Sequence, residues 1–296
     1  MKNNNVEAQH LGGGVVLFKN ALEWDWDKIT DLAEEVCARE HSSMYTEATD
    51  PETGEFAYLN RSGFYFRPES IDQMPRRGSR IHQDDRPEVI QFLTFLEDSR
   101  DAYLMKYMEM FPISFKTIWW KIKGHIVSYK PGGYLGPHSD ASSDWVYGVH
   151  EPKDQLATRS TIANLIYFNS SVDTEEELDG TNFTDGHHYF NYFDITVKPE
   201  RGDLLMFPAN YMGAHEVRPV GAGIRYSYLG WYAHGTPNPA VSESATDPLL
   251  EPELAKIATN VYMPYLKRDF VAYLKSKGKT SIDIPGFTYE DFGDGR

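Results

Sequence analysis

The amino-acid sequence predicts a mainly β protein with flanking α-helices, built as a sandwich or jelly roll. Residues 118–232 hold many short strand-like segments separated by turns rich in Gly, Pro and Asp. Helix-like periodicity is confined to the segments before and after them. The length of 296 residues suits a single large β domain, and the hydrophobic content of 41% is enough for a sizeable core.

The N-terminal part combines short strands with two helices. Residues 14–17 (GVVL) predict a strand, and residues 25–40 predict an amphipathic helix. The apolar residues at helical spacing in this helix are Ile29, Leu32, Ala33 and Val36. Residues 56–67 predict two aromatic strands around an Asn-Arg-Ser-Gly turn, and residues 88–111, after Pro87, predict a longer helix.

The strand-rich region is followed by a linker and a last helix. Residues 237–248 (PNPAVSESATDP) have the composition of a linker, and residues 252–277 predict a helix. We therefore expect one domain over residues 1–296. Its parts are a helical lead-in over 1–115, a jelly-roll core over 116–234, and a linker with a C-terminal helix over 235–296.

Charge and cysteine content exclude several classes of protein. The net charge of −15 argues against a nucleic-acid partner, because phosphate binding needs a basic face, and it slightly favours neutral or cationic substrates. A single cysteine, Cys37, permits neither an internal disulfide nor a thiolate metal cluster. No signal-peptide or membrane-spanning stretch is present, so we expect a cytoplasmic protein with no membrane partner.

Three residues form a candidate metal site. His138 and Asp140 lie two apart in GPHSDAS, and on an extended segment their side chains share a face. His215 is the candidate third ligand. Two imidazoles with one carboxylate make the facial triad of non-haem Fe(II) oxygenases, whereas a structural zinc is usually closed by four protein ligands. Considered separately, His138 and Asp140 could form a surface hydrogen bond, and His215 could be an ordinary histidine of a strand.

Arg225 and Ser227 form a candidate carboxylate site. A turn over residues 219–223 would fold two strands back on each other and bring Arg225 near His215. Residues 225 and 227 share a strand face, and a guanidinium with a hydroxyl suits a carboxylate. The alternative for Arg225 is a salt bridge at the rim of the sheet.

Five blocks of sequence resemble the prolyl-4-hydroxylase-like branch of the 2-oxoglutarate and Fe(II)-dependent dioxygenases. In chain order they are YKPGGYLGPHSD, NLIYFN, DGTNF, VKPERGDLLMFP and HEVRPVGAGIRYSYLGW. They appear in the family order and lie within residues 118–232. The resemblance implies a double-stranded β-helix (jelly-roll, cupin-like) core. It also implies a dioxygenase that uses Fe(II), 2-oxoglutarate and O2, releases succinate and CO2, and could take ascorbate as a reductant.

The resemblance implies roles for particular residues. His138, Asp140 and His215 would hold Fe(II), while Arg225 would pair with the distal carboxylate of 2-oxoglutarate with help from Ser227. Many prolyl-hydroxylase relatives have Lys at the position of Arg225. Halogenating relatives have Gly or Ala at the position of Asp140, so no halide is expected at the iron.

Three further residues come from strands that line the cosubstrate pocket in the family. Tyr129 matches a tyrosine of that pocket. Asn164 and Tyr167 lie on one strand, whose alternation allows only one of the two to point inward. We expect Asn164 to be the inward residue, because a polar side chain within an apolar strand needs a partner. His125, His187 and His188 are expected to be core, surface or loop residues.

We expect hydroxylation of an unactivated C–H bond in a small molecule, such as an amino acid or a biosynthetic intermediate. Desaturation, epoxidation or ring closure would use the same ligands. Alternative functions are a peptidyl or prolyl hydroxylase, and a non-redox or zinc-dependent metal-binding jelly roll. Residues 141–160 and 56–67 are candidate lids over the substrate. The sequence does not indicate an oligomeric state.

Overall fold

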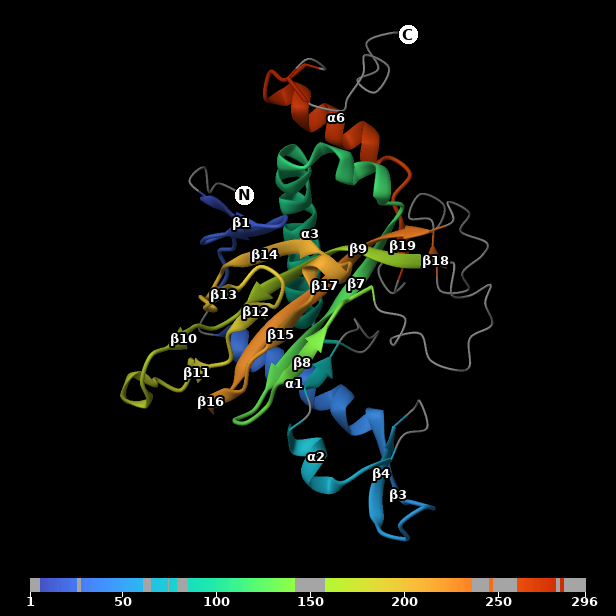
Figure 1. Ribbon diagram of the computed structural model, residues 1–296, viewed down its shortest axis with the longest axis vertical. Helices are drawn as coiled ribbons and strands as arrows, with labels where there is room; N and C mark the ends of the chain where they lie inside the picture. Colours follow the sequence, from blue (N-terminus) through green and yellow to red (C-terminus); the bar gives the residue numbers. More distant parts are fainter. Residues whose placement is uncertain are drawn as a thin grey trace.

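Two β-sheets packed face to face form the centre of the molecule, and helices cover the outer face of the larger sheet (Figure 1). This arrangement comes from a computed structural model. It describes residues 6–25, 28–60, 65–73, 75–78, 85–141, 158–235, 245–246, 260–280 and 283–284. The predicted fold class, mainly β with flanking helices, is confirmed.

The larger sheet has nine strands. Eight of them follow the order β1-β2-β14-β9-β17-β7-β19-β18, and β6 pairs with β7. Their bounds are β1 (Ala8–Gly12), β2 (Val15–Phe18), β6 (Arg76–Gly78), β7 (Trp120–Tyr129), β9 (Thr158–Tyr167), β14 (Leu204–Pro208), β17 (Arg225–Gly235), β18 (Ala245–Thr246) and β19 (Asn260–Tyr262). Strands β7, β9, β14 and β17 form its antiparallel centre.

The smaller sheet has the order β13-β12-β15-β8. Its strands are β8 (Leu135–His138), β12 (His188–Phe190), β13 (Ile195–Val197) and β15 (His215–Val217). Along the chain, these four strands are interleaved with β7, β9, β14 and β17 of the larger sheet. Eight strands that pass back and forth between two antiparallel sheets make a double-stranded β-helix, the predicted jelly roll.

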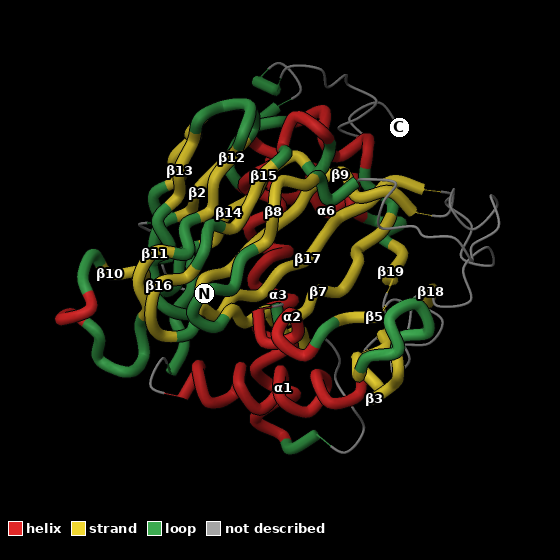
Figure 2. Tube along the Cα trace, turned by 60° about the horizontal axis from the view of Figure 1, so that its bottom comes forward, coloured by secondary structure: helices red, strands yellow, loops and turns green. Residues whose placement is uncertain are grey.

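Three helices cover the outer face of the larger sheet, as Figures 1 and 2 show from two directions. They are α1 (Ile29–Met44), α3 (Pro87–Met110) and α6 (Leu266–Ser276). The short helices are α2 (Pro68–Gln73), η2 (Pro112–Thr117), η4 (Glu175–Glu177) and η5 (Tyr211–Gly213). Within the described ranges, no helix is long and apolar enough to cross a membrane.

Two small sheets of three strands lie beside this core. One has the order β3-β4-β5 and the other β10-β11-β16. Their strands are β3 (Tyr45–Thr49), β4 (Phe56–Asn60), β5 (Tyr65–Phe66), β10 (Ser171–Val172), β11 (Phe183–Asp185) and β16 (Val220–Gly223).

Strand β9 is buried on both faces, which explains its nearly continuous apolar sequence. Ile162 and Ile166 belong to the core under the helices. Ala163, Leu165 and Tyr167 belong to the core between the two sheets. The phase of this alternation decides which side chains of β9 can face a site inside the sandwich.

Most predicted elements of the N-terminal part are confirmed. The strand predicted at 14–17 is β2, the helix at 25–40 overlaps α1, and the helix at 88–111 matches α3. The two aromatic strands at 56–67 are β4 and β5, which pair antiparallel, while their turn at 61–64 lies outside the described residues. Of the other candidate lid, residues 142–157 lie outside the described residues.

The helix predicted over 252–277 is wrong in its first part. Residues 252–259 lie outside the described residues, and Asn260–Tyr262 form β19, which pairs with β7. Pro264 disfavours a helical backbone at Met263 and is placed just before α6 begins at Leu266. Within the predicted linker 237–248, the described residues Ala245–Thr246 form β18.

A β-bulge interrupts β7 at the centre of the larger sheet. Leu229 of β17 pairs with His125, but Trp231 pairs with Ile122, so β7 carries one extra residue between these pairs. Only glycine fits at position 124 of the bulge, because a Cβ there would lie 2.2 Å from the Leu229 carbonyl oxygen.

Buried charges from α3 bind the backbone groups that the bulge displaces. Arg100 Nη2 donates to the Ile122 carbonyl at 2.8 Å and to Glu97 Oε2 at 2.8 Å. Glu97 Oε1 accepts from the Gly124 N–H at 3.0 Å and from the Tyr228 hydroxyl. Burial alone would raise the pKa of Glu97, but Arg100 and the nearby Lys121 outweigh it and hold that pKa well below its ordinary value.

Replacing Arg100 with Met should lower the free energy of unfolding by about 3–5 kcal/mol, because Glu97 would lose a buried partner. Urea denaturation measures this change. Since the folded pKa of Glu97 is lowered, its stabilisation is present above the unfolded value of about 4.3 and is lost as the pH falls below it. Arg86→Met, at the exposed pair with Glu35, is the matched control and should change little. Equal stabilities of the two variants would contradict this account.

Candidate functional site

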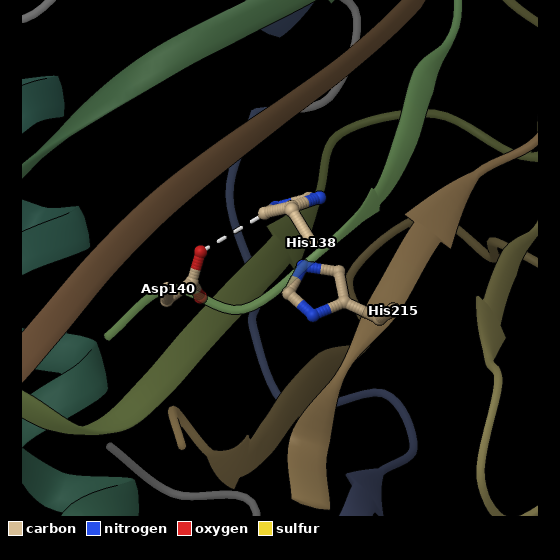
Figure 3. A group of neighbouring side chains, drawn as sticks. All are labelled: His138, Asp140 and His215. Atoms are coloured by element: carbon tan, nitrogen blue, oxygen red, sulfur yellow. Dashed lines mark ion pairs between the residues drawn. The ribbon is translucent and has the colours of Figure 1, made fainter. Parts of the chain in front are cut away.

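Strand pairing in the smaller sheet brings the three predicted metal ligands together (Figure 3). His215 on β15 lies directly opposite His138 on β8 in the antiparallel register, and their ring centroids are 4.3 Å apart. Asp140 follows two residues after His138, where β8 has ended. One nitrogen or oxygen from each of the three side chains lies within 4.8 Å of the others.

Both imidazoles are oriented by the same backbone contact. Nδ1 of His138 lies 2.8 Å from the Gly136 carbonyl oxygen, and Nδ1 of His215 lies 2.9 Å from the Gly213 carbonyl oxygen. A carbonyl only accepts, so Nδ1 carries the proton in each ring and Nε2 keeps its lone pair. This is how metal-binding histidines are usually held. Burial lowers the pKa of His215, which favours the neutral form that a metal requires.

The carboxylate of Asp140 is buried and fixed at the end of β8. The neighbouring Ser139 hydroxyl and Ala141 N–H both donate to the Ala209 carbonyl oxygen at 2.9 Å. Burial by itself would raise the pKa of Asp140, but the nearby His215 and His138 outweigh this, so the pKa lies below its ordinary value. Oδ1 lies 3.6 Å from His138 Nε2. Oδ2 has no hydrogen-bond partner among the described residues.

This donor set fits a ferrous ion. Two neutral imidazole nitrogens and one hard carboxylate oxygen are the ligands of the facial triad. The buried Asp140 Oδ2, which lacks a partner within the described part of the chain, is a group that a cation would satisfy. Three protein ligands leave further coordination positions open, as a catalytic site requires.

Arg225 begins β17 and is almost completely buried between two tyrosines. Its Cζ atom lies 5.1 Å from the ring centroid of Tyr129 and 5.6 Å from that of Tyr167. Nε and Nη2 of Arg225 have no hydrogen-bond partner in the described structure, and neither have the hydroxyls of Ser227 and Tyr167. A buried cation and two buried hydroxyls without partners fit an incoming carboxylate, which would satisfy all of them.

The expectation that Asn164 points into this site is wrong. The strand alternation of β9 puts Asn164 on the helix side, where its Nδ2 donates to the Gly230 carbonyl at 2.9 Å. A Cβ on Gly230 would approach both Asn164 and Arg100, so Asn164 lies beside the buried arginine of α3. The polar side chain does have a partner, but that partner is backbone. Tyr167 is the inward residue and lies beside Arg225.

The predicted hairpin that would join His215 to Arg225 is also wrong. Residues 220–223 are not a turn but form strand β16, which pairs with β11 in a separate small sheet. His215 belongs to the smaller sheet and pairs with His138 and Phe190, while Arg225 belongs to the larger sheet and pairs with Tyr129. The two residues face each other across the sandwich interior.

A cavity of about 270 Å³ opens beside the His138–Asp140–His215 cluster. Its lining is largely apolar and is formed by Ile122, His125, Leu135, His138, Asp140, Ser160, Leu229 and Trp231. The sequence reasoning missed His125 as a lining residue because the β7 bulge changes the alternation, so that residues 122 and 125 both face the cavity. The glycine before His125 was the available signal.

The region that contains this site matches the model of one protein family. Residues 124–233 match the family model described as the 2OG-Fe(II) oxygenase superfamily. A comparison with curated protein sequences gives no match.

Solved structures give remote matches over most of the chain. A viral collagen prolyl hydroxylase from Paramecium bursaria Chlorella virus-1, in complex with 2OG, has 14% identity and a TM-score of 0.45, covering 76% of this chain and 98% of that one. A Pseudomonas putida prolyl-4-hydroxylase has 17% identity and a TM-score of 0.43, covering 76% and 94%.

The family match confirms the resemblance at the level of the 2-oxoglutarate and Fe(II)-dependent oxygenase superfamily, and with it the expectation of an oxygenase that uses Fe(II), 2-oxoglutarate and O2. Residues 124–233 contain all three residues of the candidate metal site as well as Arg225. Over residues 124–233, the chain is similar to the 2OG-Fe(II) oxygenase superfamily.

Proposed function

We propose that this chain hydroxylates an unactivated C–H bond of a small molecule, using Fe(II), 2-oxoglutarate and O2. The observation that carries the proposal is the position of a three-ligand cluster, whose two histidines each have Nδ1 bound to a backbone carbonyl, beside a buried guanidinium that lacks partners for two of its nitrogens within the described residues. Either feature alone is also compatible with a purely structural role. Together they provide one place for a metal and one for a dicarboxylate cosubstrate.

In this proposal His138, Asp140 and His215 hold the ferrous ion. The ion, with O2 and 2-oxoglutarate, supplies the oxidative decarboxylation and the attack on the C–H bond. The protein keeps each Nε2 lone pair available by fixing the proton on Nδ1, through the carbonyl groups of Gly136 and Gly213. Because the Asp140 side chain is only 4% exposed, water competes little for its carboxylate.

Arg225 binds the distal carboxylate of 2-oxoglutarate, and Ser227 and Tyr167 donate further hydrogen bonds to it. The rings of Tyr129 and Tyr167 hold the guanidinium in place through cation–π contacts. Because the guanidinium is already held in place before binding, it loses little conformational entropy when the carboxylate binds. The residue set therefore corresponds to the predicted one, with Tyr167 in place of Asn164.

The cavity supports a small substrate. Its volume of about 270 Å³ is near the lower end of ordinary ligand pockets and suits a molecule of amino-acid size. Leu135, Leu229 and Trp231 supply apolar walls, while His125 and Ser160 supply polar groups that could orient a substrate. A C–H bond seated here would lie next to the metal cluster, because His138 and Asp140 also line the cavity.

Replacing Asp140 with Ala should weaken metal binding by more than about 100-fold, beyond what the loss of a supporting group costs. Succinate formation should fall with it. Calorimetry with Mn(II) and a succinate assay measure the two effects. Asp173→Ala, at an exposed carboxylate paired with Lys198, is the matched control. Unchanged metal affinity in Asp140→Ala would remove this residue from the site. A wild-type protein that binds metal but forms no succinate would instead favour the non-redox alternative.

Replacing Arg225 with Ala should raise the 2-oxoglutarate concentration for half-maximal turnover by about 10- to 100-fold, the loss expected for hydrogen bonds to a charged group. Metal affinity should stay the same. Arg225→Lys should restore part of the affinity, since it keeps the positive charge but not the paired donors of the guanidinium. An ordinary 2-oxoglutarate requirement in Arg225→Ala would show that the cosubstrate binds elsewhere.

Succinate release with different substrates tests the substrate class. We expect free amino acids and related small molecules to stimulate release above the uncoupled rate, because the cavity can enclose them. Peptides containing the same residues should stimulate it less. Stimulation by peptides alone would replace the small-molecule proposal with the peptidyl hydroxylase alternative.

A further inference from the structure

A third histidine, which is deeply buried, lies next to the metal cluster. His188 begins β12, is 2% exposed, and stacks on His215 with ring centroids 4.6 Å apart and an interplanar angle of 18°. The rings of Phe190 and Phe207 lie 5.0 and 5.6 Å from it. Its sequence context, a loop-like TDGHHYF, gave no sign of this position.

Neither ring nitrogen of His188 has a hydrogen-bond partner among the described residues. This distinguishes it from His138 and His215, whose Nδ1 atoms are bound to backbone carbonyls. A buried polar group without a partner is unfavourable, so a ligand that supplies the partner recovers free energy on binding. Packing alone would be served equally well by phenylalanine, which already occupies position 190 on the same face of β12.

His188 does not belong to the metal-ligand set. The nitrogen and oxygen atoms within 4.8 Å of one another come from His138, Asp140 and His215. The ring of His188 instead stacks nearly parallel on that of His215. An imidazole carries at least one ring N–H in either protonation state, so His188 offers a hydrogen-bond donor.

The turn before β12 brings this histidine close to Arg225. Gly186, at φ +60°, passes so near the arginine that a Cβ there would lie 3.2 Å from Arg225 Cδ. Two residues later His188 lies on the inner face of the smaller sheet, stacked on the metal ligand His215. A 2-oxoacid that spans from the metal to Arg225 would pass beside this ring.

We propose that His188 donates its ring N–H to the carboxylate of 2-oxoglutarate that Arg225 holds, and is thus a further cosubstrate-binding residue. This inference rests on the proposed function. It explains why a histidine, rather than a third aromatic hydrocarbon ring, fills this place in an otherwise apolar layer. The buried guanidinium, two hydroxyls and this imidazole together provide donors for both oxygens of one carboxylate.

The test compares variants that separate packing from hydrogen bonding. His188→Phe keeps a ring that can stack on His215 but removes the donor. His188→Met and His188→Gln form a second pair of similar length, in which only Gln keeps an N–H. Calorimetry on the full-length protein measures Mn(II) binding first and then 2-oxoglutarate binding to the Mn(II)-loaded protein, so that no turnover is needed.

We expect His188→Phe and His188→Met to weaken 2-oxoglutarate binding by about 10-fold or more, as for a lost hydrogen bond to a charged group. Mn(II) affinity should be unchanged, and His188→Gln should recover part of the 2-oxoglutarate affinity. If Phe does not fold at this position, the Met and Gln variants decide the question.

Two results would overturn the inference. The first is wild-type affinity for 2-oxoglutarate in the Phe or Met variant. The second is an equal loss of Mn(II) affinity in all variants, Gln included, which would mean that His188 only positions His215. A wild-type protein that does not bind 2-oxoglutarate at all would instead refute the proposed function, so the two failures are distinguishable.

Discussion

The pairing of β8 with β15 is the constraint on which the site depends. Antiparallel register places His138 directly opposite His215, and a shift of one residue would turn one of the two imidazoles to the other face of the sheet. The carbonyl two residues before each histidine then fixes the ring orientation. Asp140 is held just beyond the end of β8 by contacts of its neighbours with Ala209. Backbone geometry, rather than flexible loops, thus positions all three ligands.

Two buried arginines, Arg100 and Arg225, differ in whether their nitrogens have hydrogen-bond partners. Arg100, on the helix side of the larger sheet, is paired with Glu97 and with strand carbonyls. Arg225, inside the sandwich, has two nitrogens without partners in the described structure. Buried polar groups are normally satisfied, so groups that are not satisfied mark a place for a ligand. Tyr167, Ser227 and His188 extend this set around the same point.

The bulge in β7 connects these two sides. On the helix side, Glu97 and Arg100 bind the backbone groups that the extra residue displaces. On the inner side, the same extra residue lets Ile122 and His125 both line the cavity. A stability network on the outer face therefore helps to shape the substrate pocket on the inner face. Gly124 permits the arrangement, because any side chain there would collide with Leu229.

Much of the fold and most of the site could be predicted from the sequence, because periodicity and motif order are local signals. The spacing of His138 and Asp140 and the blocks around His215 and Arg225 were enough to indicate the metal and carboxylate sites. The predictions that were wrong concerned which face of a strand a residue occupies and which strands pair with each other. An isolated strand does not reveal whether Asn164 or Tyr167 points inward, since either phase is compatible with burial on both faces.

Pairing partners explain the remaining errors. The segment 219–223 looked like a hairpin turn because Pro and Gly flank it, yet residues 220–223 pair with β11. The bulge that redirects His125 arises from the mismatch between β7 and β17, which neither strand shows alone. The proposed role of His188 likewise depends on residues of two other strands, His215 of β15 and Arg225 of β17. Such features depend on contacts between distant segments, and no alternation rule within one segment contains them.

In the proposed enzyme, three side chains hold one metal ion with open positions next to the Arg225 guanidinium. A crystal structure of the protein with Mn(II) and 2-oxoglutarate, using the anomalous signal of manganese, tests it most directly. We expect one strong anomalous peak bonded to His138, Asp140 and His215, and a carboxylate of 2-oxoglutarate paired with Arg225. A peak elsewhere, a fourth protein ligand that closes the site, or an empty space beside Arg225 with the cosubstrate bound at another place would contradict it.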